Sequence, residues 1–165
     1  METKHGKLTP NSFLKSINLI YMVILIGMML FGSVVLFSTS PMDITMPSSD
    51  DSFLIAVPLF TFLGVVLGRV VYKRNLDFLI IEKSLKEKLL GFQKALIIKF
   101  ILVGIPFLVG VVAVISSNNM FYMMISGTLV MYFMTLKPTK NKVIKDLDLK
   151  DELALQFKNG EEILN

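Results

Sequence analysis

Four long stretches of this chain are almost free of charged side chains, and they constrain its fold more than any other feature. Residues 17–37 and 120–136 carry no charge, 53–72 carries only Arg69, and 97–115 carries only Lys99. An α-helix rises about 1.5 Å per residue, so the first stretch gives a helix of about 31 Å, which matches a hydrocarbon core of about 30 Å. The other three stretches are also within the range of spanning helices. The sequence therefore predicts four transmembrane helices.

The composition agrees with a chain that lies mostly in lipid. Hydrophobic residues make up 53% of the sequence and charged residues 18%, and the mean hydropathy is +0.66. Soluble domains are less apolar and more highly charged. We therefore predict an all-α polytopic membrane protein, an antiparallel four-helix transmembrane bundle with cytoplasmic helical extensions. Residues 1–137 would form the transmembrane domain and residues 138–165 a cytoplasmic tail.

A cleaved signal peptide is the alternative interpretation of the first stretch, because lysines precede it and small residues follow it. Its apolar run exceeds the roughly 7 to 15 residues of a signal-peptide core. Pro41 would also fall just after the only suitable cleavage point. We therefore interpret residues 17–37 as a retained span.

Positive charge is confined to segments that four crossings place on one side of the membrane. Three Lys precede the first stretch, eight Lys and Arg lie in 69–99, and six Lys lie in 137–165, which together are all 17. The connections 38–52 and 116–119 carry none. Because basic residues near span ends stay cytoplasmic, we predict a multi-pass protein of the cell inner (cytoplasmic) membrane with both termini in the cytoplasm. This asymmetry accounts for the net charge of +4. We therefore predict membrane lipid as a partner and no nucleic acid.

The segment 75–94 has an amphipathic helical pattern. Its apolar residues recur at steps of three and four: Phe78, Ile81, Leu85, Leu89 and Phe92. The opposite face mixes basic and acidic residues. The pattern predicts a helix on the cytoplasmic side. It leaves open whether that helix lies on anionic lipid or is a water-exposed extension of the second span that projects into the cytoplasm and packs on the tail.

The tail contains two short helical patterns. The first has three apolar residues on one side: Val143, Ile144 and Leu147. Asp148 followed by Asp151 is typical of a second helix start, and Asn159-Gly160 of its end. The second pattern has an apolar face of three residues: Leu149, Leu153 and Phe157. Because the tail balances six basic and six acidic residues, we predict that this face docks a protein partner or packs on the chain itself.

The chain offers little for catalysis. It has no cysteine, a single histidine, and no ionisable residue in the middle of a span, where buried charges usually mark function. We interpret five basic residues near span ends as membrane-interface anchors: Arg69, Lys73, Arg74, Lys99 and Lys137. The four tyrosines also lie near span ends, where aromatic residues gather. We expect no enzyme activity, no catalytic residue and no cofactor.

Eleven methionines raise a copper hypothesis, because thioethers suit Cu(I). Met42 and Met46 are the pair in the first outer connection, and two thioethers are too few ligands. The methionines of 120–136 are scattered round a helix and serve as packing groups. We therefore predict no metal site.

Small residues and proline indicate where helices pack. Gly64 and Gly68 form a GxxxG step in the second stretch, which would pack within the chain or form a homodimer interface. Gly104, Pro106 and Gly110 place a bend in the third stretch. A bend of this kind also occurs in the discontinuous helices of transporters, although proline and glycine are generally common in membrane helices.

The C-terminal part resembles a group of small four-span proteins of the bacterial inner membrane for which no activity is established. The matching residues are Ile105-Pro106-Phe107, Lys137-Pro138-Thr139, and the run from Lys142 to Leu147 followed by Leu149 and an acidic pair. The resemblance covers about the last seventy residues. It implies the four-span topology and no ligand or catalytic residue.

The function that follows is an accessory or scaffold component of an envelope assembly, with a protein partner or self-association. The alternative is a small oligomeric channel or transporter for an ion or uncharged solute. An intramembrane enzyme would require four polar residues to converge: Asn18, Thr61, Ser126 and Thr128.

Overall fold

The computed structural model describes residues 9–38, 44–79 and 84–160, and within these ranges the chain is helical and has no strand. The longer helices are α1 (Pro10–Ser38), α2 (Phe53–Leu79), α3 (Leu85–Ser117) and α4 (Phe121–Met134). Two short helices follow, α5 (Lys140–Asp146) and α6 (Asp151–Asn159). The predicted all-α fold is therefore confirmed.

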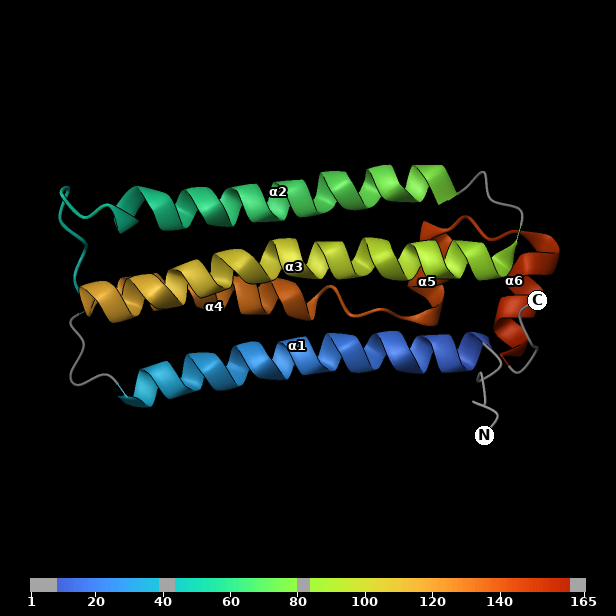
Figure 1. The fold of residues 1–165 in the computed structure, drawn as a ribbon, viewed down its shortest axis with the longest axis horizontal. Coiled ribbons are helices and arrows are strands. Elements are labelled where there is room, and N and C mark those ends of the chain that lie inside the picture. The colour runs from blue at the N-terminus through green and yellow to red at the C-terminus, as the bar shows by residue number, and fades with distance from the viewer. Residues whose placement is uncertain (1–8, 39–43, 80–83, 161–165) are drawn as a thin grey trace, which may run out of the picture.

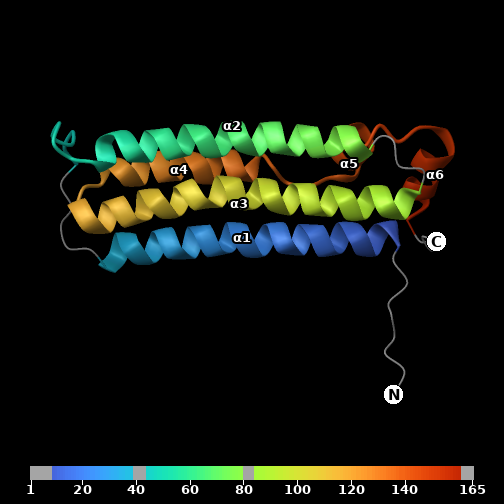
Figure 2. The same ribbon diagram turned by 45° about the horizontal axis from the view of Figure 1, so that its top comes forward.

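The four longer helices lie side by side along one axis (Figure 1). The start of α1, the end of α2 and the start of α3 lie at one end of the bundle, together with α5 and α6 (Figure 1, Figure 2). α3 contacts α1, α2 and α4. In an apolar stretch of 18 residues, half of the α3 residues are buried, against 28% in α1 and 17% in α2. α3 is therefore the central helix.

Length separates α4 from the other three helices. α1, α2 and α3 have 29, 27 and 33 residues and are long and apolar enough to cross a membrane. α4 has 14 residues, or about 21 Å. α4 ends at Met134, whereas the predicted stretch continues to residue 136. Pro138 disfavours helical backbone at the residue before it, and helices usually end at or before such a residue.

The segment 75–94 forms no separate helix in the described residues. Residues 75–79 continue α2, residues from Leu85 onward begin α3, and Ile81 lies outside the described residues. The predicted stripe is buried within the chain at Leu85, Leu89 and Phe92. Phe92 contacts the rings of Phe13 on α1 and Tyr72 on α2. The stripe therefore packs against the chain's own helices, although Phe78 remains exposed.

The tail helices differ in their ends from the sequence prediction. α5 begins after Thr139, whose side chain accepts a hydrogen bond from the backbone N–H of Lys142. The residue before α6 is Lys150, so the predicted cap at Asp148 is wrong, and Asp148 instead has a φ of 46°. The predicted stop is confirmed, because Gly160 ends α6 with a φ of 70°.

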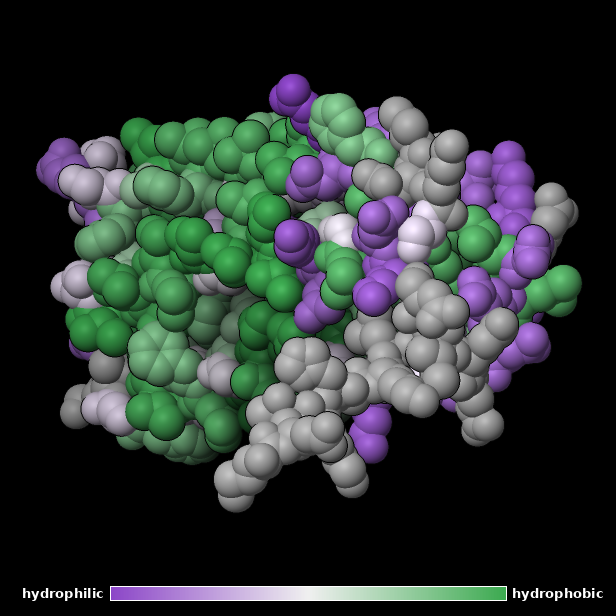
Figure 3. Space-filling model, turned by 45° about the vertical axis from the view of Figure 1, so that its right-hand side comes forward, coloured by the Kyte–Doolittle hydropathy of each residue, from purple (hydrophilic) through white to green (hydrophobic). Residues whose placement is uncertain are grey.

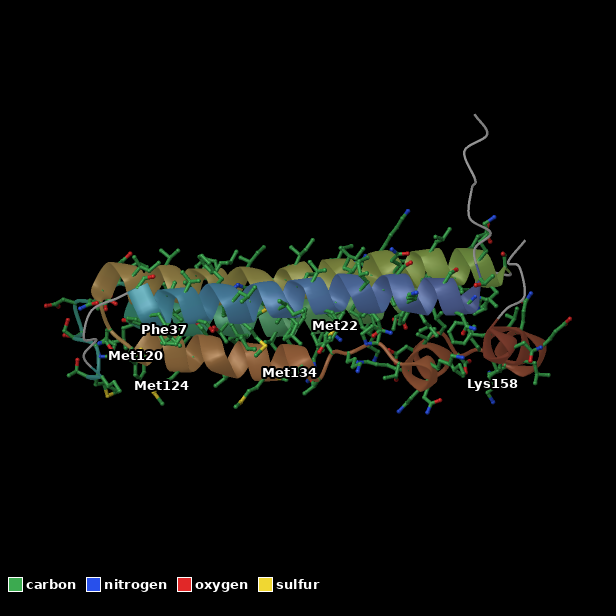
Figure 4. The ribbon with its side chains drawn as sticks, turned by 90° about the horizontal axis from the view of Figure 1, so that it is seen from below. Met22, Phe37, Met120, Met124, Met134 and Lys158 are labelled. Carbon is green, nitrogen blue, oxygen red and sulfur yellow. The ribbon has the colours of Figure 1, made fainter. Side chains whose placement is uncertain are left out.

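The surface of the molecule is apolar over one part of its length and polar toward the other end (Figure 3). The apolar belt consists of the exposed apolar side chains of α1 residues 19–37, α2 residues 55–70, α3 residues 98–115 and α4 residues 124–134. It extends for about 27 Å along α1 and about 26 Å along α3. Phe37 and Met120 lie at one end of the molecule and Lys158 at the other (Figure 4). The 14 residues of α4 span about 21 Å, so this helix is about one helical turn shorter than the belt.

Candidate functional site

Aromatic rings fill the bundle at the edge of the apolar belt that borders the polar part of the molecule, which we name the inner edge. The rings of Tyr21 and Phe133 stack with centroids 5.4 Å apart, and Phe100 lies 5.1 Å from Phe133 and 5.9 Å from Tyr21. Phe100 and Phe133 are fully buried, and Tyr21 is nearly so. Because the three rings come from α3, α4 and α1, they close the space between these helices with solid packing.

The early end of α4 leaves backbone carbonyls that have no donor within the helix. The hydroxyl of Tyr21 donates to the carbonyl oxygen of Met134 at 3.1 Å, and the Lys142 ammonium donates to that of Thr135 at 3.5 Å. The Thr135 hydroxyl donates back to the carbonyl of Tyr132 at 2.7 Å. Side chains from α1 and α5 thus complete the end of the short helix.

A polar junction of four residues links α5 to the bundle: Tyr72, Lys99, Lys142 and Asp146. The Tyr72 hydroxyl donates to the Asp146 carboxylate at 2.7 Å. The Lys99 ammonium lies 4.2 Å from the centroid of the Tyr72 ring, a cation–π contact, and only 7% of Lys99 is exposed. Burial lowers the pKa of Lys142 on α5 from its usual 10.5, and the Asp146 carboxylate opposes this shift. The junction therefore holds the tail by directional contacts.

A second polar contact ties the connections at the opposite end of the bundle. One carboxylate oxygen of Asp51 accepts a hydrogen bond from the backbone N–H of Phe53 at the start of α2. The other accepts from the Tyr122 hydroxyl of α4 at 2.6 Å. Asn119 donates from its side chain to the carbonyl of Thr45 at 3.0 Å. The start of α2 and the start of α4 are therefore joined.

The predicted anchors divide into two groups. Arg69, Lys73, Arg74 and Lys137 are exposed at or beyond the inner edge of the belt. Lys99 is buried and contacts Tyr72, so its charge faces the junction. The sequence interpretation missed this role because it treated every basic residue near a span end alike.

The predicted docking face of the tail is covered by the chain itself. Leu149 and Phe157 are buried, and Leu153 is half-buried. The backbone N–H of Asn11 at the start of α1 donates to the carbonyl of Gly160 at 3.1 Å. A partner could reach this face only if α6 detached from the bundle.

The predicted packing residues lie in two different environments. Four of the five pack inside the chain: Gly64, Gly68, Pro106 and Gly110. A Cβ on Gly64 would lie 2.5 Å from the carbonyl oxygen of Leu102 and would overlap the ring of Pro106, and one on Gly68 would lie 3.6 Å from Val103. A Cβ on Gly110 would overlap the hydroxyl of Ser126 on α4. Gly104 differs, because a Cβ there would have no neighbour within 4 Å.

Gly104 lines an apolar groove between α1 and α3 with a volume of about 300 Å³. Gly27 lies on the α1 side, and a Cβ there would also meet nothing within 4 Å. The other lining residues are aliphatic, aromatic or thioether side chains, such as Ile24 and Ile101. The groove lies within the apolar belt and is open to its surface.

In the described ranges, no hydrogen bond joins any two of the four polar side chains that an intramembrane enzyme would require. Ser126 and Thr128 donate to carbonyls of their own helix, at Tyr122 and Ile125. One oxygen each of Asn18 and Thr61 is buried without a partner, on different helices. In the same ranges, no three His, Cys, Asp or Glu side chains could hold a metal ion.

No protein-family model, curated protein or solved structure matches this chain. The resemblance of the C-terminal part to small four-span proteins therefore stays a prediction. What the fold defines is an integral membrane protein with three long apolar helices and a shorter fourth.

Proposed function

We propose that this chain crosses the bacterial cytoplasmic membrane four times, with both termini in the cytoplasm and with α4 as the short fourth span. Every Lys and Arg of the described ranges lies at the inner edge of the belt or beyond it. The positive-inside rule assigns that end to the cytoplasm. The side-chain bonds to Met134 and Thr135 support a crossing by α4 despite its length, because non-helical backbone near lipid needs internal partners.

Its role would be non-catalytic: an accessory or scaffold component of an envelope assembly that binds a transmembrane helix of a partner protein. The observation that carries this role is the groove between α1 and α3, where Gly27 and Gly104 leave open space on a lipid-facing surface. Small residues let helix backbones approach closely, which is the usual basis of helix association in lipid. This site replaces the tail face as the docking surface, since the chain covers that face.

A channel or transporter would need several copies, because the ring layer of Tyr21, Phe100 and Phe133 fills the space between three helices of one chain. Solute movement into liposomes that contain the purified protein, above that into empty vesicles, would favour a channel over the scaffold.

A site-specific photocrosslinker tests the scaffold role directly. Placed at Ile101, inside the groove, it should link to one partner protein in cells, and Gly104→Leu should abolish the link by filling the groove. The matched controls are a crosslinker at Val66 on the exposed side of α2 and Val112→Leu on α3. Crosslinks from Ile101 to lipid alone, or equal protein links from Val66, would contradict the proposal.

A further inference from the structure

A second groove lies between the inner ends of α2 and α3 and has a volume of about 260 Å³. α2 contributes Asn75, Phe78 and Leu79, and α3 contributes Lys94 and Ile98. Apolar side chains thus line most of it, with one ammonium group and one amide beside them. This mixed lining differs from the wholly apolar groove beside Gly104.

The position of this groove matches the edge of the membrane. Ile98 is the first exposed apolar residue of the belt on α3, and Lys94 lies one helical turn further inward, about 6 Å along the axis. The headgroup layer on each side of the hydrocarbon is about 5 to 8 Å thick. The groove therefore opens from the hydrocarbon at Ile98 into the headgroup layer at Lys94.

The charge beside the groove is positive. Arg74 lies one turn from Phe78 on the same face of α2, so basic residues lie on both helices. Neither Arg74 nor Lys94 forms an ion pair within the described ranges. Among the residues that the structure describes, the carboxylates nearest in sequence are Asp77 and Glu87, and neither lines the groove.

We propose that this groove binds the headgroup of an anionic phospholipid from the cytoplasmic leaflet. The Lys94 ammonium and the Asn75 side-chain amide donate to the lipid phosphate, and Phe78, Leu79 and Ile98 contact the glycerol and the first methylene groups. The groove supplies both halves of what an interfacial lipid needs, a donor pair at headgroup level and an apolar wall below it. The proposal rests on the membrane location proposed above.

Native mass spectrometry of the full chain in detergent tests this site. Phosphatidylglycerol should bind more tightly than phosphatidylcholine with the same acyl chains. Lys94→Gln should weaken phosphatidylglycerol binding about fivefold, and Asn75→Ala should weaken it in the same direction. Lys86→Gln, the same change at an exposed position of α3 outside the groove, should leave binding within about twofold. An unchanged melting temperature shows that each variant is folded.

Three outcomes would overturn the proposal. Equal weakening by Lys94→Gln and Lys86→Gln would mean diffuse attraction. Equal affinity for the two lipids would exclude an anionic-lipid site. Loss of a dimer in Lys94→Gln with unchanged lipid binding would assign the groove to a second copy. Release of the chain from membranes at alkaline pH would instead contradict the proposed membrane location. The lipid titration on purified protein would still measure binding at the groove, so the two failures are distinguishable.

Discussion

At the scale of single residues, three tyrosines act through hydrogen bonds inside the protein. Tyr21, Tyr72 and Tyr122 are at most 7% exposed, and their hydroxyls reach Met134, Asp146 and Asp51. Their positions near span ends predict interfacial aromatics, and nothing in the local sequence indicates partners more than seventy residues away. A buried tyrosine beside a carboxylate distant in sequence is a tertiary feature that periodicity cannot show.

The bond between Tyr72 and Asp146 should be measurable as a coupling energy. In a double-mutant cycle with Tyr72→Phe and Asp146→Asn, we expect a coupling of about 1 to 3 kcal/mol, because the bond joins a half-shielded hydroxyl to a charged acceptor. The measurement is the free energy of unfolding in detergent. Tyr132→Phe, at a half-buried tyrosine, should change it by less than about 0.5 kcal/mol. A coupling near zero would contradict a role for this bond in holding the tail at the polar junction.

Lys142 should make docking of the tail depend on pH. Its pKa is lowered in the folded chain, so the docked tail binds fewer protons than the detached tail between that lowered pKa and 10.5. Stability therefore rises as the pH increases through this window. Protection of the tail from proteolysis, measured from pH 8 upward, should show the rise in the native chain and in Lys145→Gln. Lys142→Gln should flatten it, and an identical profile in all three proteins would refute the assignment.

At the scale of elements, the contact between α2 and α3 depends on the absence of side chains. Gly64 faces the backbone of Leu102, whose carbonyl lacks its usual helical donor because Pro106 has no N–H. The GxxxG step and the proline are visible in the sequence as separate signals. Their meeting is not, because it depends on the register between two helices.

Replacing Gly64 by alanine should push these helices apart. We expect a loss of about 1 to 3 kcal/mol in unfolding free energy, because the new Cβ meets rigid backbone and a proline ring. Gly27→Ala is the matched control in α1, where open space and the better helix propensity of alanine should prevent any loss. Thermal unfolding in detergent compares the two. Equal melting temperatures would show that α2 and α3 do not pack in this register.

The tail helix α6 should detach when its buried ring is removed. Phe157 is fully buried, so Phe157→Ala should destabilise the docked tail by about 3 to 5 kcal/mol. Limited proteolysis should then cleave near Lys150 in intact purified protein. Leu155→Ala, at a side chain that is 62% exposed, should leave the tail resistant. Resistance in both variants would mean that α6 does not depend on this contact.

At the scale of the whole molecule, hydropathy predicts more than it does at smaller scales. The apolar stretches of the sequence correspond to α1, α2, α3 and α4, since burial in lipid demands apolar surface all round a helix. The pattern at 75–94 predicts either a helix on the membrane surface or an extension of the second span, whereas residues 75–79 continue α2 and residues from Leu85 onward belong to α3. Periodicity reports an apolar face but not what covers it. The grooves beside Lys94 and Gly104 depend on interhelical gaps and leave no signal in one sequence.

Accessibility of single cysteines to a membrane-impermeant maleimide tests the crossing and its orientation most directly, because the native chain has no cysteine to give background. Asn118→Cys lies in the exposed turn between α3 and α4, and Lys140→Cys lies at the exposed start of α5. Intact cells should label the first variant and not the second, and lysis should expose the second. Labelling of Lys140→Cys in intact cells, or equal labelling of both variants there, would contradict a four-span chain with its basic end in the cytoplasm.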